Sequence, residues 1–291
     1  MKLLSQLING LNAGSIYALI ALGYTMVYGI AKMINFAHGD IIMVGAYVVW
    51  VAIAVLKLPV SVGLIIGVAA CAVLGIFIEK VAYKPLRKAP PLAVLITAIG
   101  VSYFLQSASL LIFSSAKRTF PVSFDIPAIT IGSLVVPGQT ILILVVTSIC
   151  MIALHLFINK TKAGSAMLAV SEDKDAAQLM GVNVNKTISM TFAIGSALAA
   201  VAGVLFASSY VYVYPTMGSL IGIKAFVAAV LGGIGSVPGA MLGGILLGLI
   251  ESLSKTYLST QLSNAIVFGI LILVLLVRPS GLLGKSRTEK V

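Results

Sequence analysis

Nine apolar segments follow one another along this chain, and most are close to the length at which a helix crosses a lipid bilayer. They cover residues 5–30, 39–56, 60–82, 92–114, 138–158, 188–213, 218–234, 239–254 and 261–277. A helix needs about 20 apolar residues to cross the hydrocarbon core. With 60% hydrophobic and 9% charged residues, the composition lies outside the range of soluble globular domains. We therefore predict an all-α polytopic membrane protein with about eight to ten transmembrane helices, forming a single transmembrane domain over residues 1–291.

Glycine and proline interrupt several of these segments, which predicts that some helices are broken or re-entrant. Such backbone is tolerated at membrane depth only where protein or a water-filled cavity covers it. The interval IleAsnPheAlaHisGlyAsp at 34–40, between the first two segments, is one such place. Small residues also recur four apart, as in Gly195, Ala199, Gly203 and Ala207, and this spacing predicts close packing between helices.

Basic residues gather in alternate loops, and this pattern predicts the orientation of the chain because cytoplasmic loops are enriched in Lys and Arg. The loops after the third, fifth and last segments hold Lys80, Lys84, Arg87, Lys88, Lys160, Lys162, Lys174, Lys186, Arg278, Lys285, Arg287 and Lys290, whereas the opposite loops hold Lys57, Lys117, Arg118 and Lys255. We expect a cytoplasmic C-terminus. The side of the N-terminus stays open, because it depends on whether the 34–40 interval ends a complete crossing. Orientation also accounts for the net charge of +11, so we expect no nucleic-acid partner.

The longest polar interval, residues 159–187, is predicted to be a cytoplasmic coupling loop. Its charged residues have no place in hydrocarbon, and it contains SerGluAspLysAspAlaAlaGlnLeuMetGly at 171–181. The AlaAla and LeuMet steps predict an apolar stripe on a short polar helix, which suits docking into a groove of a partner. The residues assigned to this coupling role are Glu172, Asp173, Asp175, Ala176, Ala177, Leu179 and Gly181.

A second sizeable loop, residues 114–137, is predicted to be extended and extracytoplasmic. It contains Pro121, Pro127 and Pro137 among alternating apolar residues. Two interpretations stay open: a simple connector, and a docking surface for a protein that delivers substrate.

Polar residues between or within apolar segments are costly in a membrane and therefore mark candidate sites. Asn35, His38 and Asp40 are candidates for a substrate path or gate. The alternative is structural, with Asp40 capping the second helix and His38 at the membrane interface. One His and one Asp do not make a metal site, and we predict none.

Lys224 is the fourth candidate for the substrate path. It stands inside the seventh apolar segment, where its ammonium must either snorkel to the interface or face a polar interior. Glu251 with Lys255 is predicted to be a local interfacial pair, and Glu79 with Lys80 is interpreted in the same way.

Catalytic signatures are absent from the sequence, which contains no nucleophile elbow and no HisGluXaaXaaHis. We therefore expect a transport protein rather than an enzyme. Energy for active transport has to come from another subunit or from an ion gradient.

Three stretches carry a resemblance to a known family. The first combines AlaGlySerIleTyrAlaLeuIleAlaLeuGlyTyrThrMetValTyrGly at 13–29 with IleAsnPheAlaHisGlyAsp at 34–40. The second is the 171–182 stretch, and the third is IleGlyIleLysAlaPheValAlaAlaValLeuGlyGlyIleGlySerValProGlyAla at 221–240. All three resemble LivH-type permeases. In that family the permease is one of two membrane subunits of a bacterial ABC importer for the branched-chain amino acids Leu, Ile and Val.

The resemblance implies a set of partners and a location. These are a LivM-type permease, two ATPase subunits of the LivG and LivF types that bind ATP and Mg, and an extracytoplasmic amino-acid-binding protein, all at the inner membrane. It implies no cofactor on this chain. AspAlaAlaGlnLeuMetGly at 175–181 is similar to the GluAlaAla-x-x-x-Gly motif that inserts into the ATPase, although Asp175 replaces Glu and the Ile-x-Leu-Pro tail is absent. The alternatives are a related permease for urea, short amides or another small solute, and an ion-coupled secondary carrier.

Overall fold

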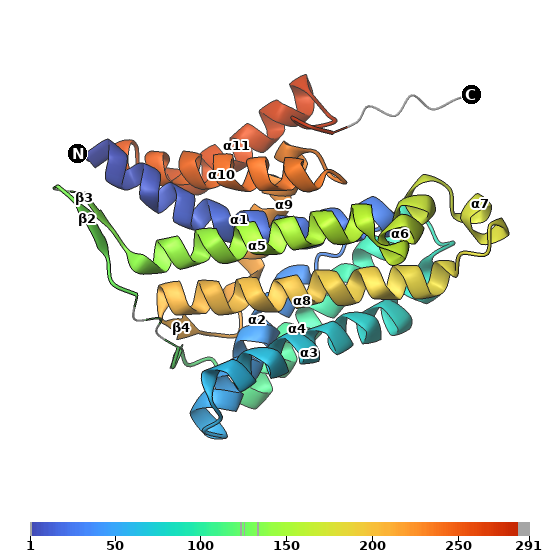
Figure 1. The fold of residues 1–291 in the computed structure, drawn as a ribbon, viewed down its shortest axis with the longest axis horizontal. Helices are drawn as coiled ribbons and strands as arrows, with labels where there is room; N and C mark the ends of the chain where they lie inside the picture. Colours follow the sequence, from blue (N-terminus) through green and yellow to red (C-terminus); the bar gives the residue numbers. More distant parts are fainter. Residues whose placement is uncertain (1, 123, 125, 133, 285–291) are drawn as a thin grey trace. The chain divides into compact units, whose positions relative to one another are not determined.

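The computed structural model describes residues 2–122, 124, 126–132 and 134–284, and over these residues the protein is almost entirely helical (Figure 1). The α-helices are α1 (Lys2–Ala31), α2 (His38–Trp50), α3 (Val60–Ile78), α4 (Pro91–Phe113), α5 (Gly138–Lys160), α6 (Lys162–Glu172), α7 (Lys174–Leu179), α8 (Val184–Tyr210), α9 (Met217–Gly232), α10 (Val237–Tyr257) and α11 (Leu262–Val277). Short turns of other helix types, η1 (Val51–Val55), η2 (Glu79–Tyr83) and η3 (Lys84–Leu86), extend α2 and α3. Lys285, Arg287 and Lys290, which contribute to the predicted orientation, lie outside the described residues.

Each predicted apolar segment coincides with a helix, which confirms an all-α polytopic membrane protein. Within the described part of the chain, seven helices are long and apolar enough to cross a membrane: Leu3–Ala31, His38–Val55, Val60–Leu86, Pro91–Phe113, Gly138–Lys160, Val184–Tyr210 and Val237–Tyr257. The two remaining apolar helices, Met217–Gly232 and Leu262–Val277, are shorter.

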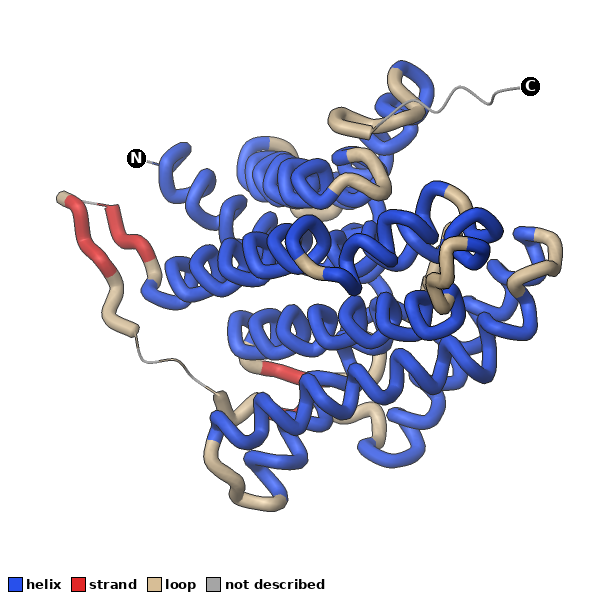
Figure 2. The backbone as a smooth tube through the Cα atoms, turned by 45° about the vertical axis from the view of Figure 1, so that its right-hand side comes forward, coloured by secondary structure: helices blue, strands red, loops and turns tan. Residues whose placement is uncertain are grey.

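Four short strands accompany the helices in the described part of the chain, and strands are red in Figure 2. β1 (Arg118–Thr119) pairs antiparallel with β4 (Tyr212–Val213), and β2 (Ile129–Ile131) pairs antiparallel with β3 (Leu134–Val136). Three of them lie within residues 114–137, in keeping with the extended chain predicted there.

The chain forms two compact units. Unit 1 consists of residues 1–25, 125–151 and 224–291, and unit 2 of residues 26–124 and 152–223. The boundaries fall inside α1, α5 and α9, so each of these helices contributes residues to both units.

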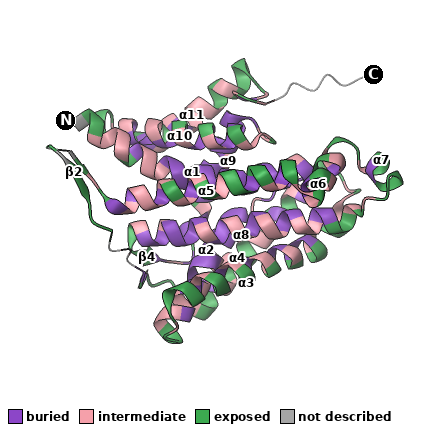
Figure 3. Cartoon of the chain, viewed as in Figure 1, coloured by how far each residue is buried: buried purple, intermediate pink, exposed green. Residues whose placement is uncertain are grey.

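Within unit 2, small residues allow α2, α3 and α8 to pack with their backbones close together. A Cβ added at Gly75 of α3 would strike the Phe192 carbonyl and the Ser196 side chain of α8, and one at Gly203 of α8 would strike the Ile42 carbonyl of α2. The predicted small-residue spacing on α8 is confirmed as a buried packing face, and Figure 3 shows how much of this helix is buried. Because lipid tails are as apolar as leucine, such close contact is a main source of helix association in membranes.

In unit 1, glycines likewise allow close packing where α1 crosses α10. A Cβ at Gly244 would strike the Ala18 backbone, and one at Gly248 would strike the Gly14 backbone. These contacts fix the α1 residues of unit 1 against α10.

Candidate functional site

The coupling loop folds as two short helices, α6 and α7, between α5 and α8 (Figure 1). A side chain caps the start of each helix in this region. The Thr161 hydroxyl accepts a hydrogen bond from the Gly164 N–H (3.0 Å), the Asp173 carboxylate from the Asp175 and Ala176 N–H groups (2.8 and 2.9 Å), and the Asn183 amide oxygen from the Lys186 N–H (3.0 Å). Capping satisfies N–H groups that have no partner within the helix, so local sequence sets these helix starts.

Gly181 ends α7 in a Schellman motif. Its φ of +84° lies in the left-handed region that glycine adopts without steric cost. The Gly181 N–H donates to the Gln178 carbonyl (3.0 Å), and the Val182 N–H donates to the Ala177 carbonyl (3.0 Å). The glycine therefore turns the chain directly from α7 into α8.

The outward surface of α7 is apolar at its C-terminal end. Leu179 is 90% exposed and Met180 85% exposed, and we call these two residues the docking pair. Ala176 is also exposed, whereas Ala177 is only 4% exposed and faces its own protein. The AlaAla step thus splits between the two faces of the helix, and Ala177 does not belong to an outward stripe.

The acidic residues assigned to the loop are also at the surface. Glu172, Asp173 and Asp175 are all exposed, and Asp173 also serves as the cap of α7. A partner that binds here has to accommodate carboxylates beside two large apolar side chains.

Lys174, at the start of α7, reaches back to the end of α1. Its ammonium donates to the carbonyl oxygen of Ala31 at 3.2 Å. Burial lowers the pKa of Lys174, the nearby charge of Arg87 lowers it further, and Asp175 opposes both effects. A cation at a helix start interacts unfavourably with the helix dipole. The position of Lys174 in the sequence is therefore a signal that its ammonium has a partner outside α7.

A buried ion pair lies close behind the coupling loop in unit 2. Glu79 is completely buried, forms an ion pair with Arg87, and accepts a hydrogen bond from the Ser189 hydroxyl at 2.5 Å. Arg87 also donates to the Asn185 side chain in the first turn of α8. The predicted interfacial pair of Glu79 with Lys80 is wrong, because Glu79 lies four residues after Gly75 on the buried face of α3 and pairs with Arg87 instead.

Residues 32–37 leave the helical conformation between α1 and α2, and we call them the broken segment. Asn35 is 2% exposed, and His38 and Asp40 are each 1% exposed, so the structure brings these three candidates together in the interior of unit 2. The Tyr83 hydroxyl donates to the Asn35 side-chain oxygen (2.9 Å), and Gln106 donates to the Asp40 carboxylate (3.0 Å). Among the described residues, the buried Asn35 amide nitrogen has no hydrogen-bond partner.

The structural alternative for this region is wrong in its details. α2 starts at His38 with Ala37 as its N-cap and no side-chain cap, so Asp40 lies in the first turn rather than at the N-cap, and its carboxylate accepts a hydrogen bond from Gln106. His38 is buried rather than interfacial. Gln106 lies about 22 Å along α4 from Pro91, which puts the Asp40 carboxylate at membrane depth.

The start of α2 meets the start of α9 at two glycines. A Cβ at Gly39 would strike the Gly218 carbonyl, and a Cβ at Gly218 would strike the Gly39 carbonyl. Two helix N-termini with their partial positive charges therefore lie close together beside the broken segment.

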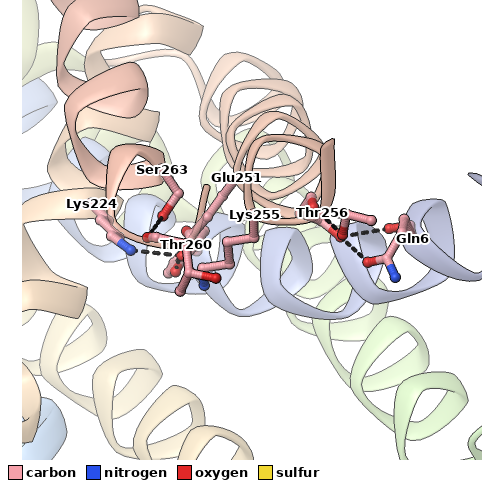
Figure 4. A network of polar contacts seen from close by, with 9 residues as sticks. Gln6, Lys224, Glu251, Lys255, Thr256, Thr260 and Ser263 are labelled. Atoms are coloured by element: carbon pink, nitrogen blue, oxygen red, sulfur yellow. Dashed lines mark hydrogen bonds and ion pairs between the residues drawn. The ribbon is translucent and has the colours of Figure 1, made fainter. Parts of the chain in front are cut away.

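Lys224, the fourth candidate, lies in unit 1 and faces a polar interior (Figure 4). It is 4% exposed, and its ammonium donates to Glu251 at 2.7 Å. The same carboxylate binds Lys255 at 2.5 Å and accepts a hydrogen bond from the Tyr17 hydroxyl at 2.7 Å. The pair of Glu251 with Lys255 is present as predicted, but Glu251 is 2% exposed, so it is not a simple interfacial pair. Spacing within one helix could not reveal partners from α1 and α9.

The sequence was compared with known protein families and proteins. Residues 6–275 match the family described as branched-chain amino acid transport system / permease component. The chain is 47% identical to the high-affinity branched-chain amino acid transport system permease protein BraD of Pseudomonas aeruginosa, over 99% of this chain and 98% of BraD. It is 45% identical to the permease protein LivH of Escherichia coli, over 99% of this chain and 97% of that protein.

A more distant relative covers most of the chain as well. The probable branched-chain amino acid transport permease protein LivH of Methanocaldococcus jannaschii is 30% identical over 93% of this chain and 89% of that protein. The helical arrangement, the nine apolar segments and these matches agree with one another. The chain belongs to the family of permease components of branched-chain amino acid transport systems.

Proposed function

We propose that this chain is the permease subunit of an ABC importer that moves the branched-chain amino acids Leu, Ile and Val across the bacterial inner membrane. The observation that carries the proposal is the near full-length identity of 47% and 45% to two permeases whose names state this substrate class. The chain forms the membrane passage, and ATP hydrolysis takes place on separate subunits.

The proposed complex contains a LivM-type second permease, two ATPases of the LivG and LivF types that bind ATP and Mg, and an extracytoplasmic amino-acid-binding protein. The coupling loop and the C-terminus face the cytoplasm in this arrangement. Support for the orientation comes from contacts within unit 2, where Arg87 of one basic loop binds Asn185 beside the other.

The docking pair on α7 is the proposed contact with an ATPase. Leu179 and Met180 present apolar surface to water, which is unfavourable unless a partner covers it. Closure of the ATPase dimer on ATP would then push α7 and, through the short Gly181 turn, α8. Alternating access follows when this movement changes which side of the membrane the passage faces.

The substrate path in this proposal passes the broken segment. A branched-chain amino acid has an ammonium group, a carboxylate and an apolar side chain. Asp40 is suited to the ammonium, and the helix N-termini at Gly39 and Gly218 are suited to the carboxylate. Lys224 is engaged by Glu251, so it reaches a carboxylate only if that ion pair opens.

Reconstitution tests the proposal. The chain is purified with the second permease and both ATPases, placed in proteoliposomes, and supplied with binding protein and radiolabelled leucine. ATP-dependent uptake that excess isoleucine and valine suppress, and that urea and acetamide do not, is the expected result. Uptake that follows an ion gradient without ATP, or that urea suppresses, would reject it.

A further inference from the structure

Two series of contacts, which we call links, lead from the coupling helix α7 to the broken segment. All the residues in them belong to unit 2. The first is direct. Lys174 in the first turn of α7 donates to the carbonyl oxygen of Ala31, the last residue of α1, and the broken segment starts at the next residue. The C-terminal carbonyls of a helix lack partners within the helix and carry partial negative charge, so an ammonium is suited to this position.

The second link runs through the start of α8. Asn185 accepts a hydrogen bond from Arg87, and Arg87 forms an ion pair with the buried Glu79 at the start of η2. Tyr83 closes η2, and its hydroxyl donates to Asn35 within the broken segment. Ser189, one turn further along α8, holds the second oxygen of Glu79.

We propose that Lys174 and Arg87 are positioning residues that carry the displacement of α7 to the broken segment, one through the Ala31 carbonyl and the other through the buried Glu79 carboxylate. This inference rests on the proposed function, in which α7 is moved by an ATPase. The first link ends on Ala31, directly before the broken segment, and the second ends on Asn35 within it. His38 and Asp40 follow in the first turn of α2. A displacement of α7 therefore has two routes of side-chain contacts to the broken segment.

The burial of these groups separates this role from ATPase docking. Glu79 is completely buried and the Arg87 side chain is 16% exposed, so both face the interior rather than a partner. The Lys174 ammonium is bound to Ala31 of its own chain. Networks of packed and hydrogen-bonded side chains of this kind couple distant sites by amounts that mutation can measure.

The experiment uses the complete transporter in proteoliposomes and measures leucine uptake and ATP hydrolysis in the same sample. The informative variants are Lys174→Met, which removes the donor but keeps the length of the side chain, and the double variant Asn185→Ala with Ser189→Ala, which releases both Arg87 and Glu79 from α8 and leaves their ion pair intact. Lys174→Arg retains a donor. Lys88→Met is the matched control, because Lys88 is an exposed lysine next to Arg87 with no described role in either link.

We expect leucine uptake per ATP hydrolysed to fall about tenfold in Lys174→Met and in the double variant Asn185→Ala with Ser189→Ala, a size typical of coupling between sites, while hydrolysis stays near the wild-type rate. Lys174→Arg should recover most of the uptake, and Lys88→Met should change neither quantity. Unchanged coupling in both informative variants overturns the inference. Loss of stimulated hydrolysis together with uptake also overturns it, because the residues would then serve docking. If the wild-type complex itself shows no ATP-dependent uptake, the proposed function fails instead.

Discussion

At the scale of single residues, the notable feature is the number of charged side chains that the protein buries and pairs. Glu251 holds Lys224, Lys255 and Tyr17, and Glu79 holds Arg87 and Ser189. An unpaired charge in a low-dielectric interior is far more costly than a paired one. Each carboxylate therefore serves as an anchor for several elements within its own unit.

The Glu251 cluster should respond unequally to loss of its members. Glu251→Gln leaves Lys224 buried without its anion and should destabilise the protein by about 3 kcal/mol, in the range for breaking a buried pair. Lys224→Met leaves Glu251 with two partners and should cost less. The double variant removes both charges and should recover most of the stability. Thermal unfolding in detergent measures all three, and a double variant as unstable as Glu251→Gln would contradict this account.

Uptake by the same double variant separates two roles of Lys224. If its function is only to pair with Glu251, a stable double variant should also transport. Stability without uptake would instead give Lys224 a part in the passage.

Asp40 offers a second test at this scale. Asp40→Asn keeps the shape of the side chain and the contact with Gln106 but removes the negative charge, so in the proposed substrate path the ammonium loses a charged partner. Hydrogen bonds to charged groups contribute about 1.5 to 3 kcal/mol, and uptake should therefore fall by at least about tenfold. Gln106→Ala, which retains the charge, is the control. Normal uptake by Asp40→Asn would leave this carboxylate a structural role in the first turn of α2.

At the scale of elements, α7 combines strong local signals with a surface that only a partner would cover. Its start is capped by Asp173 and its end is turned by Gly181, so the sequence around it determines its length. The docking pair contributes nothing to packing within the chain, because both side chains are almost fully exposed.

Leu179→Asp should leave insertion and stability nearly unchanged, since exposed substitutions usually shift stability by less than about 0.5 kcal/mol. Association with the ATPases should fall, because the variant places a carboxylate where apolar contact is needed. Co-purification of the ATPases measures the effect. Gln178→Asp, with the same added charge on a polar position of α7, should bind better than Leu179→Asp, and equal losses in the two would argue against an apolar contact.

Glycines provide a matched comparison between helices. Gly75→Ala and Gly248→Ala place a methyl group against backbone or side-chain atoms and should cost about 1 to 3 kcal/mol, as overpacking does. At Gly100 and Gly269 an added Cβ meets nothing within 4 Å. Alanine there should be neutral or stabilising by up to about 1 kcal/mol, because alanine favours the helix. Thermal unfolding of the four variants measures these changes in stability. Equal effects at all four positions would contradict close packing at Gly75 and Gly248.

The sequence predicted the helices well because their signal is local. Lipid imposes one length and one composition on each crossing, so nine apolar segments could be found without knowing their neighbours. The polar contacts could not be found in this way. Glu251 binds Tyr17 from 234 residues away and Lys224 from 27 residues away, and both partners lie on helices other than α10. The pairing of Glu79 with Arg87 was missed for a related reason, because Arg87 lies beyond the turns η2 and η3 that follow α3.

At the scale of the whole molecule, α1 provides a test of membrane topology. Its 30 residues span about 45 Å, which exceeds the hydrocarbon thickness of about 30 Å. Ala31 at its end is bound to Lys174 of the coupling loop. The other end of this helix should therefore emerge on the side opposite to the coupling loop. The pattern of basic loops left the side of the N-terminus open, and the length of α1 predicts the extracytoplasmic side.

Cysteine labelling checks this topology. In a background with Cys71 and Cys150 replaced by alanine, Leu3→Cys should react with a membrane-impermeant maleimide in spheroplasts, and Lys162→Cys should react only in inverted vesicles. Both positions are exposed, so access is limited by the membrane alone. Labelling of both positions from the same side would contradict the topology. Arg278→Cys should behave like Lys162→Cys if the C-terminus is cytoplasmic.

The exposed Leu179 and Met180 also have a consequence for production of the protein in cells. A subunit synthesised without its partner subunits would expose these two apolar side chains to the cytosol throughout its lifetime. Chaperones and proteases recognise such exposed apolar surface. Expression of the chain alone should therefore give short-lived or self-associating material. Matched expression with the ATPases should lengthen its half-life, and the Leu179→Asp variant should lose that benefit.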